Sequence, residues 1–209
     1  MITLHALKYS RANRILWLLA DLGQPCNRID YDRTKSLRAP EALKRVHPLG
    51  KSPVIEDEGE MIAESATILR YLAAKYADNS HTPPQGTPAY WQHEALLDYV
   101  EASFAEVALQ AILPAFGGEP VPETARSALD VHLDYITQLI GDGPLLFGNR
   151  AMLADIQMSY IIALLARLDL LNDHPVIATY WDALQEQPGY IAATQARGPM
   201  APPADTERK

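Results

Sequence analysis

The segment from Ala77 to Ala89 divides this chain into two parts of different character. It combines three prolines with a glycine, an asparagine and a serine, so neither a helix nor a strand is expected to continue through it. Before it, short alternating apolar runs are interleaved with helical periods, whereas nearly every later segment has helical spacing. We therefore expect two domains, over residues 1–78 and 89–209, joined by a linker at 79–88.

The first part has the element order β-α-β-α-β-β-α, in which the first strands alternate with helices and the last two strands are joined directly. The last two strands flank an acidic turn with Gly59, which is typical of a β-hairpin. The expected strands cover residues 2–6, 27–32, 54–55 and 61–62, and the expected helices cover 10–22, 40–46 and 64–76. This part is predicted to be an α/β domain.

The second part is predicted to be a helical bundle. A long first helix is expected to stop at Pro114, and the third helix has apolar residues all around it, which indicates a buried central position. The expected helices cover residues 91–113, 122–140, 153–171, 175–184 and 189–196.

Composition narrows the classes of function. Asp and Glu outnumber Lys and Arg by 26 to 18, giving a net charge of −8. An acidic chain without a basic cluster argues against nucleic acid and membrane partners. The single cysteine, Cys26, cannot form an internal disulfide, which suits a cytoplasmic location. The six histidines are scattered and no metal-binding motif occurs, so no metal site is expected.

Ser10 stands where the first helix should begin, with Arg14 one turn later. A serine there can be an ordinary N-cap that satisfies free backbone amides. Alternatively, its hydroxyl can steady an anion at the positive end of the helix. Local sequence alone leaves both interpretations open.

Two further segments have a structural and a functional interpretation. Pro53 opens a strand after a glycine loop, and a cis peptide bond there would expose the backbone of Ser52 to an extended peptide ligand. Glu64 and Ser65 open a helix after a strand, which is common at helix N-termini. They could also clamp the amino-acid end of a ligand, with Ser65 and the helix amides on a carboxylate and Glu64 on an ammonium group.

In this order and spacing, these features resemble the glutathione transferase family over essentially the whole chain. The segment 10–19, with the sequence SRANRILWLL, resembles the first helix of a subgroup found in bacteria and fungi. The segment 47–53 is similar to the loop before that subgroup's cis-proline, and 63–65 to the family's glutamyl-binding signature. The segment 148–155 resembles the family's buried capping motif, with Met152 where Ser or Thr is usual.

The resemblance implies an N-terminal thioredoxin-like domain followed by an all-helical domain. It also implies a role for each site residue. Ser10, with Tyr9 as the alternative, would stabilise the glutathione thiolate. The glutathione-binding residues would be Lys51, Ser52, Pro53, Glu64 and Ser65.

The implied activity is conjugation of the glutathione thiolate to a small, hydrophobic electrophile, as in detoxification, with no cofactor beyond the co-substrate glutathione. The resemblance also implies a homodimer, for which Trp91, Tyr99 and Phe104 offer contacts. Rival interpretations are a glutathione-dependent peroxidase, isomerase or dehalogenase, or a non-catalytic regulatory protein on the same fold. Thiol exchange is disfavoured because Cys26 falls too late in the sequence for a nucleophile at the first helix.

Overall fold

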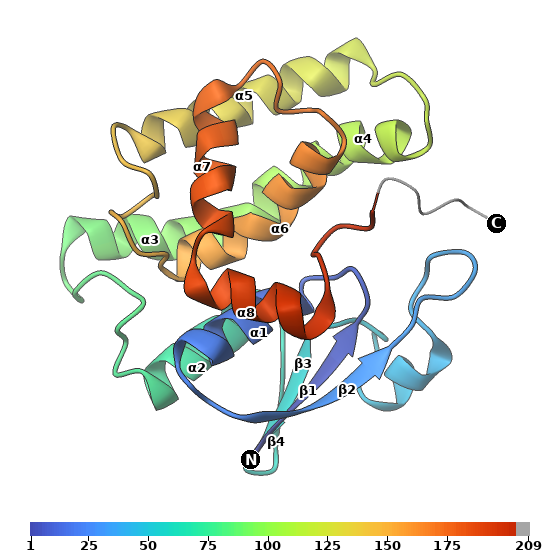
Figure 1. Cartoon of the computed structure of the whole chain (residues 1–209), viewed down its shortest axis with the longest axis vertical. Helices are drawn as coiled ribbons and strands as arrows, with labels where there is room; N and C mark the ends of the chain where they lie inside the picture. Colours follow the sequence, from blue (N-terminus) through green and yellow to red (C-terminus); the bar gives the residue numbers. More distant parts are fainter. Residues whose placement is uncertain (204–209) are drawn as a thin grey trace. The chain divides into compact units, whose positions relative to one another are not determined.

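A computed structural model describes residues 1–203 as two compact units. The first unit is built on a four-stranded mixed sheet in the order β2-β1-β3-β4 (Figure 1). Strand β1 pairs in parallel with β2 and antiparallel with β3, and β3 pairs antiparallel with β4. The strands are β1 (Ile2–Leu7), β2 (Cys26–Tyr31), β3 (Val54–Asp57) and β4 (Glu60–Ala63). The predicted thioredoxin-like arrangement is confirmed.

Strand β1 is central because both of its edges are paired. Leu4 and Ala6 are fully buried, as the alternating pattern predicts for one face of a strand. On the alternate positions, the buried ring of His5 bonds to the Tyr31 hydroxyl at 2.9 Å and to a carboxylate oxygen of Glu56 at 2.8 Å. These polar contacts join all three neighbouring strands on one face of the sheet.

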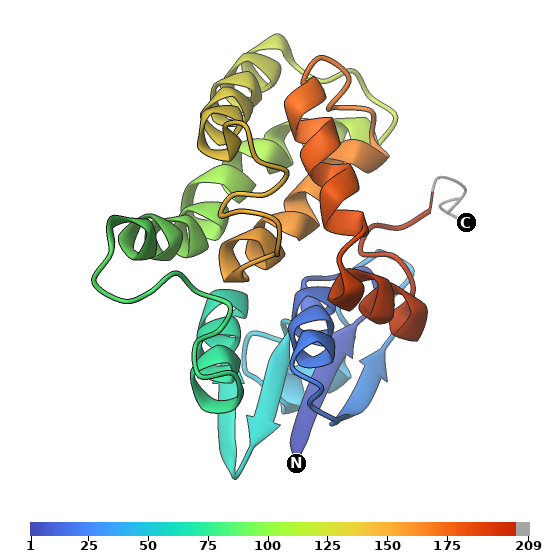
Figure 2. The same cartoon turned by 60° about the vertical axis from the view of Figure 1, so that its left-hand side comes forward.

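Up to residue 203, three α-helices belong to the first unit: α1 (Ala12–Asp21), α2 (Ser65–Tyr76) and α8 (Pro188–Arg197). Helix α1 packs against both of the others and lies between them (Figure 2). The short helix expected at 40–46 is a 3₁₀ helix over Glu41–Arg45.

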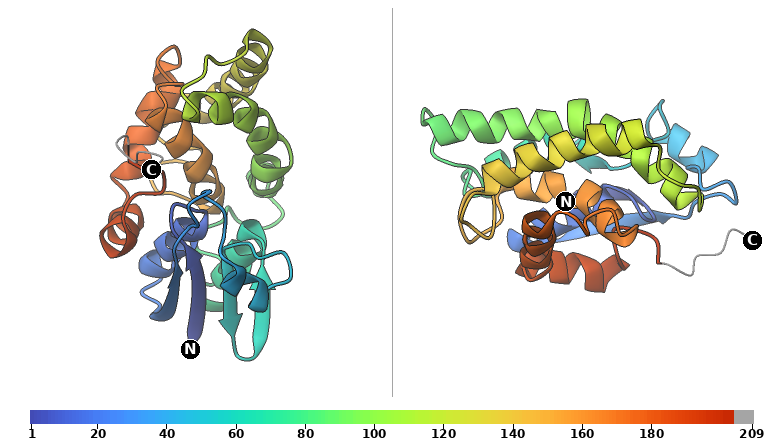
Figure 3. Two further views of the ribbon diagram at one scale, coloured as in Figure 1. Left: turned by 90° about the vertical axis from the view of Figure 1, so that its right-hand side faces the viewer. Right: turned by 90° about the horizontal axis from the view of Figure 1, so that it is seen from above.

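The second unit is helical, apart from an isolated β-bridge between Leu145 and Gly148. Its helices are α3 (Pro88–Tyr99), a π-helical turn (Val100–Phe104), α4 (Ala105–Phe116), α5 (Glu123–Ile140), α6 (Leu153–Arg167) and α7 (Pro175–Gln185). The π turn joins α3 to α4, and α5 runs beside this long helical rod (Figure 3). Within residues 81–187, every residue of α6 from Leu153 to Leu165 is buried, as its all-round apolar pattern predicts.

The long first helix of this unit differs from its prediction at both ends. It begins earlier, because Pro88 suits the first helical position and the Thr87 hydroxyl accepts a hydrogen bond from the amide of Tyr90. It also continues past Pro114 to Phe116. A proline this close to the end of a helix removes one hydrogen bond but leaves few later residues to disturb.

The contacts divide the chain differently from the expected domains. Residues 1–80 group with the segment from Pro188 onward, and 81–187 form the other unit. Helix α8 was assigned to the helical domain, but it packs against α1 and its Arg197 bonds to β1 and β2. The reason lies in a contact between distant parts of the sequence: Gly189 has no side chain, which lets α8 approach Trp17 and Asp21 closely.

An aromatic cluster joins the end of α3, the π turn and α5. Tyr99 stacks on His132, with its hydroxyl 2.7 Å from the ring nitrogen Nδ1, and meets Tyr135 edge-on. Phe104 stacks against the same cluster and is fully buried. The expectation that Phe104 contacts a second copy of the chain is therefore wrong, because its ring is used inside its own unit.

In the part of the chain from residue 1 to 203, no helix combines the length and the apolar character needed to cross a bilayer.

Gly189→Ala is predicted to destabilise the protein. A Cβ atom at this position would lie 2.6 Å from Cγ of Asp21, and closer still to the Trp17 ring. Overpacking of this kind costs about 1–3 kcal/mol, more than the ~1 kcal/mol that alanine gains over glycine in a helix. Urea denaturation measures the difference. A midpoint equal to or above that of the wild type would show that α8 does not approach α1 this closely.

Met152→Thr is predicted to stabilise the protein by about 1 kcal/mol. Met152 precedes α6, and its sulfur is a weak acceptor for the amide of Asp155, where a hydroxyl would be a good one. The return bond already exists, because the Asp155 carboxylate accepts from the Met152 amide at 3.0 Å. Denaturation at pH 8 is the suitable test, since burial raises the pKa of Asp155 to about 6. An unchanged midpoint would mean that packing by Met152 compensates for the poor cap.

Candidate active site

Ser10 lies in the turn between β1 and α1. Its side chain is buried, its Oγ donates to the carbonyl of Leu7 at 2.6 Å, and the amide of Ala12 donates to the same oxygen at 3.2 Å. The helix N-cap is Arg11 rather than Ser10, so the predicted cap is displaced by one residue. The Ser10 hydroxyl nevertheless accepts from the first amide of α1, which places it beside the positive end of that helix.

Tyr9 precedes Ser10 in a left-handed conformation, with φ 51°. This conformation turns the chain sharply between the strand and the helix. The ammonium group of Lys8 lies 5.3 Å from the centre of the Tyr9 ring. Both candidate hydroxyls are therefore in the same turn, and that of Ser10 is bonded to the start of α1.

Ser52 lies just before β3, and the Ser52–Pro53 peptide bond is cis, as predicted. Its hydroxyl accepts from the amide of Leu7 and donates to the carbonyl of His5, both at 2.9 Å. By contrast, no residue between 1 and 203 hydrogen bonds to the main-chain N–H or C=O of Ser52. The Ser52 side chain is thus committed to β1, while its backbone is open to a ligand.

Glu64 and Ser65 stand where β4 passes into α2. Glu64 is the N-cap in a left-handed conformation, with φ 66°, and no side chain caps the helix. Ser65 is buried, and neither side chain bonds to any part of the chain described. Their position follows from the hairpin, since Ala63 pairs with Val54, the residue after Pro53. The open end of α2 therefore lies across from the open backbone of Ser52.

Leu7 connects the two sides of the site. Its carbonyl accepts from Ser10 and its amide donates to the hydroxyl of Ser52. The exposed side chain of Lys51 adjoins Ser52 and has no ion pair with another residue in the range 1–203. The structure thus brings Ser10, Ser52 and the start of α2 to one edge of the sheet, with a free positive charge nearby. A donor-rich edge of this kind suits an extended ligand with anionic groups.

Sequence analysis missed two arginines that hold the turn around Ser10. The guanidinium of Arg33 donates to the carbonyls of Lys8 at 2.9 Å and Tyr9 at 2.6 Å. Arg197, at the end of α8, donates to the carbonyl of Ala6 at 2.7 Å. Neither residue belongs to a motif, because an arginine that binds main-chain carbonyls from a remote segment leaves no local pattern.

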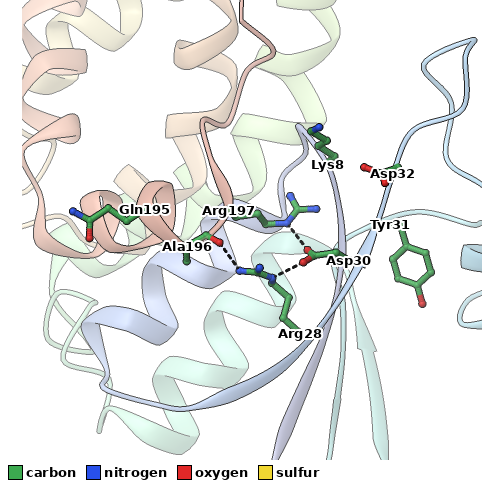
Figure 4. A pocket seen from close by; sticks show the side chains of 8 residues that line it. All are labelled: Lys8, Arg28, Asp30, Tyr31, Asp32, Gln195, Ala196 and Arg197. Carbon is green, nitrogen blue, oxygen red and sulfur yellow. Dashed lines mark hydrogen bonds and ion pairs between the residues drawn. The ribbon is translucent and has the colours of Figure 1, made fainter.

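A separate cavity of about 280 Å³ lies between the end of β2 and α8. Figure 4 shows Asp30 bridging two arginines there, with 2.9 Å contacts to Arg28 and to Arg197. Partial burial alone would raise the pKa of Asp30, but these two hydrogen bonds outweigh it and lower the pKa. Both arginines share the carboxylate of Asp30, and this bridge ties α8 to β2. None of the predicted site residues lines the cavity.

Cys26 is half-buried at the start of β2, and burial raises the pKa of its thiol. A thiol with a raised pKa is almost fully protonated at neutral pH and is a poor nucleophile. The prediction that Cys26 is a strand residue and not the reactive group agrees with this position.

Comparison of this chain with known proteins finds its relatives in one family. Residues 1–74 match the family model described as the glutathione S-transferase N-terminal domain. Glutathione S-transferase 3 of Schizosaccharomyces pombe is 30% identical over 191 residues, covering 84% of this chain and 78% of that protein.

Solved structures support the same family assignment. A glutathione S-transferase from Actinobacillus pleuropneumoniae superposes with a TM-score of 0.83 at 29% identity, covering 94% of this chain and 93% of that one. A sphingomonad glutathione S-transferase, solved in complex with glutathione, shares the fold with a TM-score of 0.74 at 20% identity, covering 94% and 98%. Open main-chain groups at a cis-proline, an uncapped α2 and a hydroxyl at α1 are thus found in a chain that belongs to the glutathione S-transferase family.

Proposed function

We propose that this chain conjugates the thiolate of reduced glutathione to a small, hydrophobic electrophile, with Ser10 as the hydroxyl that stabilises the thiolate. The observation that carries the proposal is the unpaired main chain of Ser52 opposite the uncapped start of α2. A tripeptide needs both an edge to pair with and a place for its terminal charges, and this edge of the sheet offers the two together. The sphingomonad enzyme of the same fold binds glutathione, which supports this choice of ligand.

Each part of glutathione has a matching group in the proposed site. The cysteinyl unit pairs with the N–H and C=O of Ser52, as an added strand would. The α-carboxylate of the γ-glutamyl unit receives the Ser65 hydroxyl and the first amides of α2, and Glu64 meets its ammonium group. Lys51 supplies a positive charge for a carboxylate of the tripeptide.

The rate of conjugation depends on how much of the bound glutathione is ionised to the thiolate. An ordinary thiol has a pKa near 8.5, so only a few per cent is ionised at neutral pH. A hydrogen bond to the anion together with the end of a helix contributes roughly 2–3 kcal/mol, or about two pKa units. That shift makes the thiolate the main species at pH 7 without a metal or a redox cofactor.

The proton of the Ser10 hydroxyl must reorient for this role. It now donates its proton to the carbonyl of Leu7, whereas thiolate stabilisation requires that proton to point at sulfur. A hydroxyl proton rotates freely about its C–O bond, so this exchange needs no movement of the main chain. The anion is a stronger acceptor than the carbonyl, which favours the exchange when glutathione binds.

The decisive experiment for the activity measures glutathione binding by calorimetry and conjugation to a panel of electrophiles and peroxides. We expect binding together with turnover of at least one alkyl or aryl electrophile. Absence of glutathione binding would overturn the proposal. Turnover of peroxides without conjugation would favour the peroxidase interpretation instead.

Ser10→Ala is predicted to raise the pKa of bound glutathione by about one unit and to lower turnover at neutral pH about tenfold. Tyr9→Phe is the matched control, since it removes a hydroxyl from the same turn and should leave that pKa unchanged. The thiolate absorbance of bound glutathione, titrated against pH, reports both variants. The reverse result, with a shift only in Tyr9→Phe, would place the chain outside the proposed serine-type subgroup of bacteria and fungi.

We also propose that the chain forms a homodimer through the long α3–α4 rod and α5. Large apolar side chains are exposed there, including Trp91 at 65% and Val131 at 67%, with Tyr135 beside Tyr99. Closed twofold pairing is the commonest assembly of soluble proteins.

Val131→Glu is predicted to weaken this dimer, because a carboxylate would be buried without a partner. Ile191→Glu, at an exposed position on α8, is the matched control and should leave the association unchanged. Sedimentation at micromolar concentration measures both variants. A wild-type protein that sediments only at its chain mass of 23.1 kDa would contradict the proposal.

A further inference from the structure

Arg33 makes three hydrogen bonds, and each goes to a main-chain carbonyl. Nε donates to Lys8 at 2.9 Å, Nη2 to Tyr9 at 2.6 Å and Nη1 to Leu37 at 2.7 Å. Leu37 itself lies in a tight turn, closed by a bond from the amide of Thr34 to the carbonyl of Arg38. One side chain therefore ties the loop after β2 to the turn that carries Ser10.

The carbonyl of Tyr9 belongs to the same peptide unit as the amide of Ser10. Arg33 binds the oxygen of that unit, while the Ser10 N–H has no partner among residues 1–203. A cation on the oxygen of a peptide polarises the unit and strengthens its N–H as a donor. In a trans peptide the two groups point in opposite directions, so Arg33 and an anion would occupy opposite sides of this unit.

The charge of Arg33 is not cancelled at this position. No carboxylate in residues 1–203 forms an ion pair with its guanidinium, unlike the arginines on either side of Asp30. A guanidinium is charged at every accessible pH, and its planar fork can hold two adjacent carbonyls at once. Arg33 thus combines a fixed geometry with an unneutralised positive charge one peptide unit from Ser10.

We infer that Arg33 is a positioning residue for the thiolate: it holds and polarises the Tyr9–Ser10 peptide unit, so that the Ser10 amide acts with the Ser10 hydroxyl as a preorganised donor. This inference rests on the proposed function, since it concerns the thiolate of the same site. Preorganised dipoles aimed at a charge cost no reorganisation when that charge forms. The Ser10 turn then offers two donors to sulfur, and the second depends on a residue 23 positions later in the chain.

The test compares Arg33→Met with Arg38→Met. Both remove one positive charge from the same loop, but the side chain of Arg38 makes no hydrogen bond or ion pair within residues 1–203. Arg33→Lys keeps the positive charge but loses the planar fork that is preorganised for two adjacent carbonyls. The readouts are the thiolate absorbance of bound glutathione against pH, kcat/KM between pH 6 and 9, and the urea midpoint of each variant.

We expect Arg33→Met to raise the pKa of bound glutathione by about one unit and to lower kcat/KM at pH 6.5 about fivefold. The loss should disappear near pH 9, where the thiol ionises unaided. Arg33→Lys should recover part of the shift, and Arg38→Met should match the wild type. A loss of equal size at every pH would indicate a merely structural role and overturn the inference, as would equal titrations for Arg33→Met and Arg38→Met.

The two proposals fail in different ways. A wild-type protein that neither binds nor conjugates glutathione overturns the proposed function and this inference together. A wild-type protein that does both, with a thiol pKa indifferent to Arg33, overturns the inference alone. Should Arg33→Met fail to fold, Arg33→Lys carries the test. A thiol pKa above that of the wild type would support the inference. A thiol pKa identical to that of the wild type would show that the planar fork does not position the peptide unit, and would overturn the inference.

Discussion

The site depends on how strand β1 ends. Both edges of β1 are paired along the sheet, and at Leu7 the ladder to β3 is replaced by a single hydroxyl. The Ser52 side chain bonds to the amide of Leu7 and to the carbonyl of His5, as a neighbouring strand would do. This substitution leaves the main chain of Ser52 unpaired, so the interaction that terminates the strand is also the one that opens an edge for a ligand.

The same strand end is held from two further directions. Arg197 binds the carbonyl of Ala6, and Arg33 binds the next two exposed carbonyls, those of Lys8 and Tyr9. Asn13, in the first turn of α1, donates to the carbonyl of Gly198 at 2.9 Å and so adds a second tie to the segment after α8. Carbonyls that turn away from a sheet need donors, and here charged side chains from remote segments provide them. The turn around Ser10 is therefore rigid without regular secondary structure.

Sequence patterns predicted those parts of the molecule whose causes are local. Alternation located β1, the glycine turn located the hairpin, and Pro53 in its loop pointed to a cis bond that the structure contains. What escaped prediction has causes that are distant in sequence. Gly189 matters only because Trp17 lies across from it, and Arg33 only because two carbonyls face it. The N-cap at Arg11 escaped for a smaller reason, since Ser10 serves the helix from one position further out.

Thiolate chemistry on a chain with a net charge of −8 must rely on short-range donors, because the overall field repels an anion. At the candidate site, neither α1 nor α2 has an acidic residue in its first turn, and the carboxylate at the N-cap of α2, Glu64, is the one proposed to meet the ammonium group. Lys51 and Arg33 lack carboxylate partners in the described chain, whereas Arg28 and Arg197 share the carboxylate of Asp30. Positive groups without a carboxylate partner are thus found where the proposed tripeptide carries its charges, and arginines paired with a carboxylate are found where α8 is bound to β2. Because water and salt screen the distant acidic residues more strongly than these adjacent donors, the local arrangement outweighs the net charge.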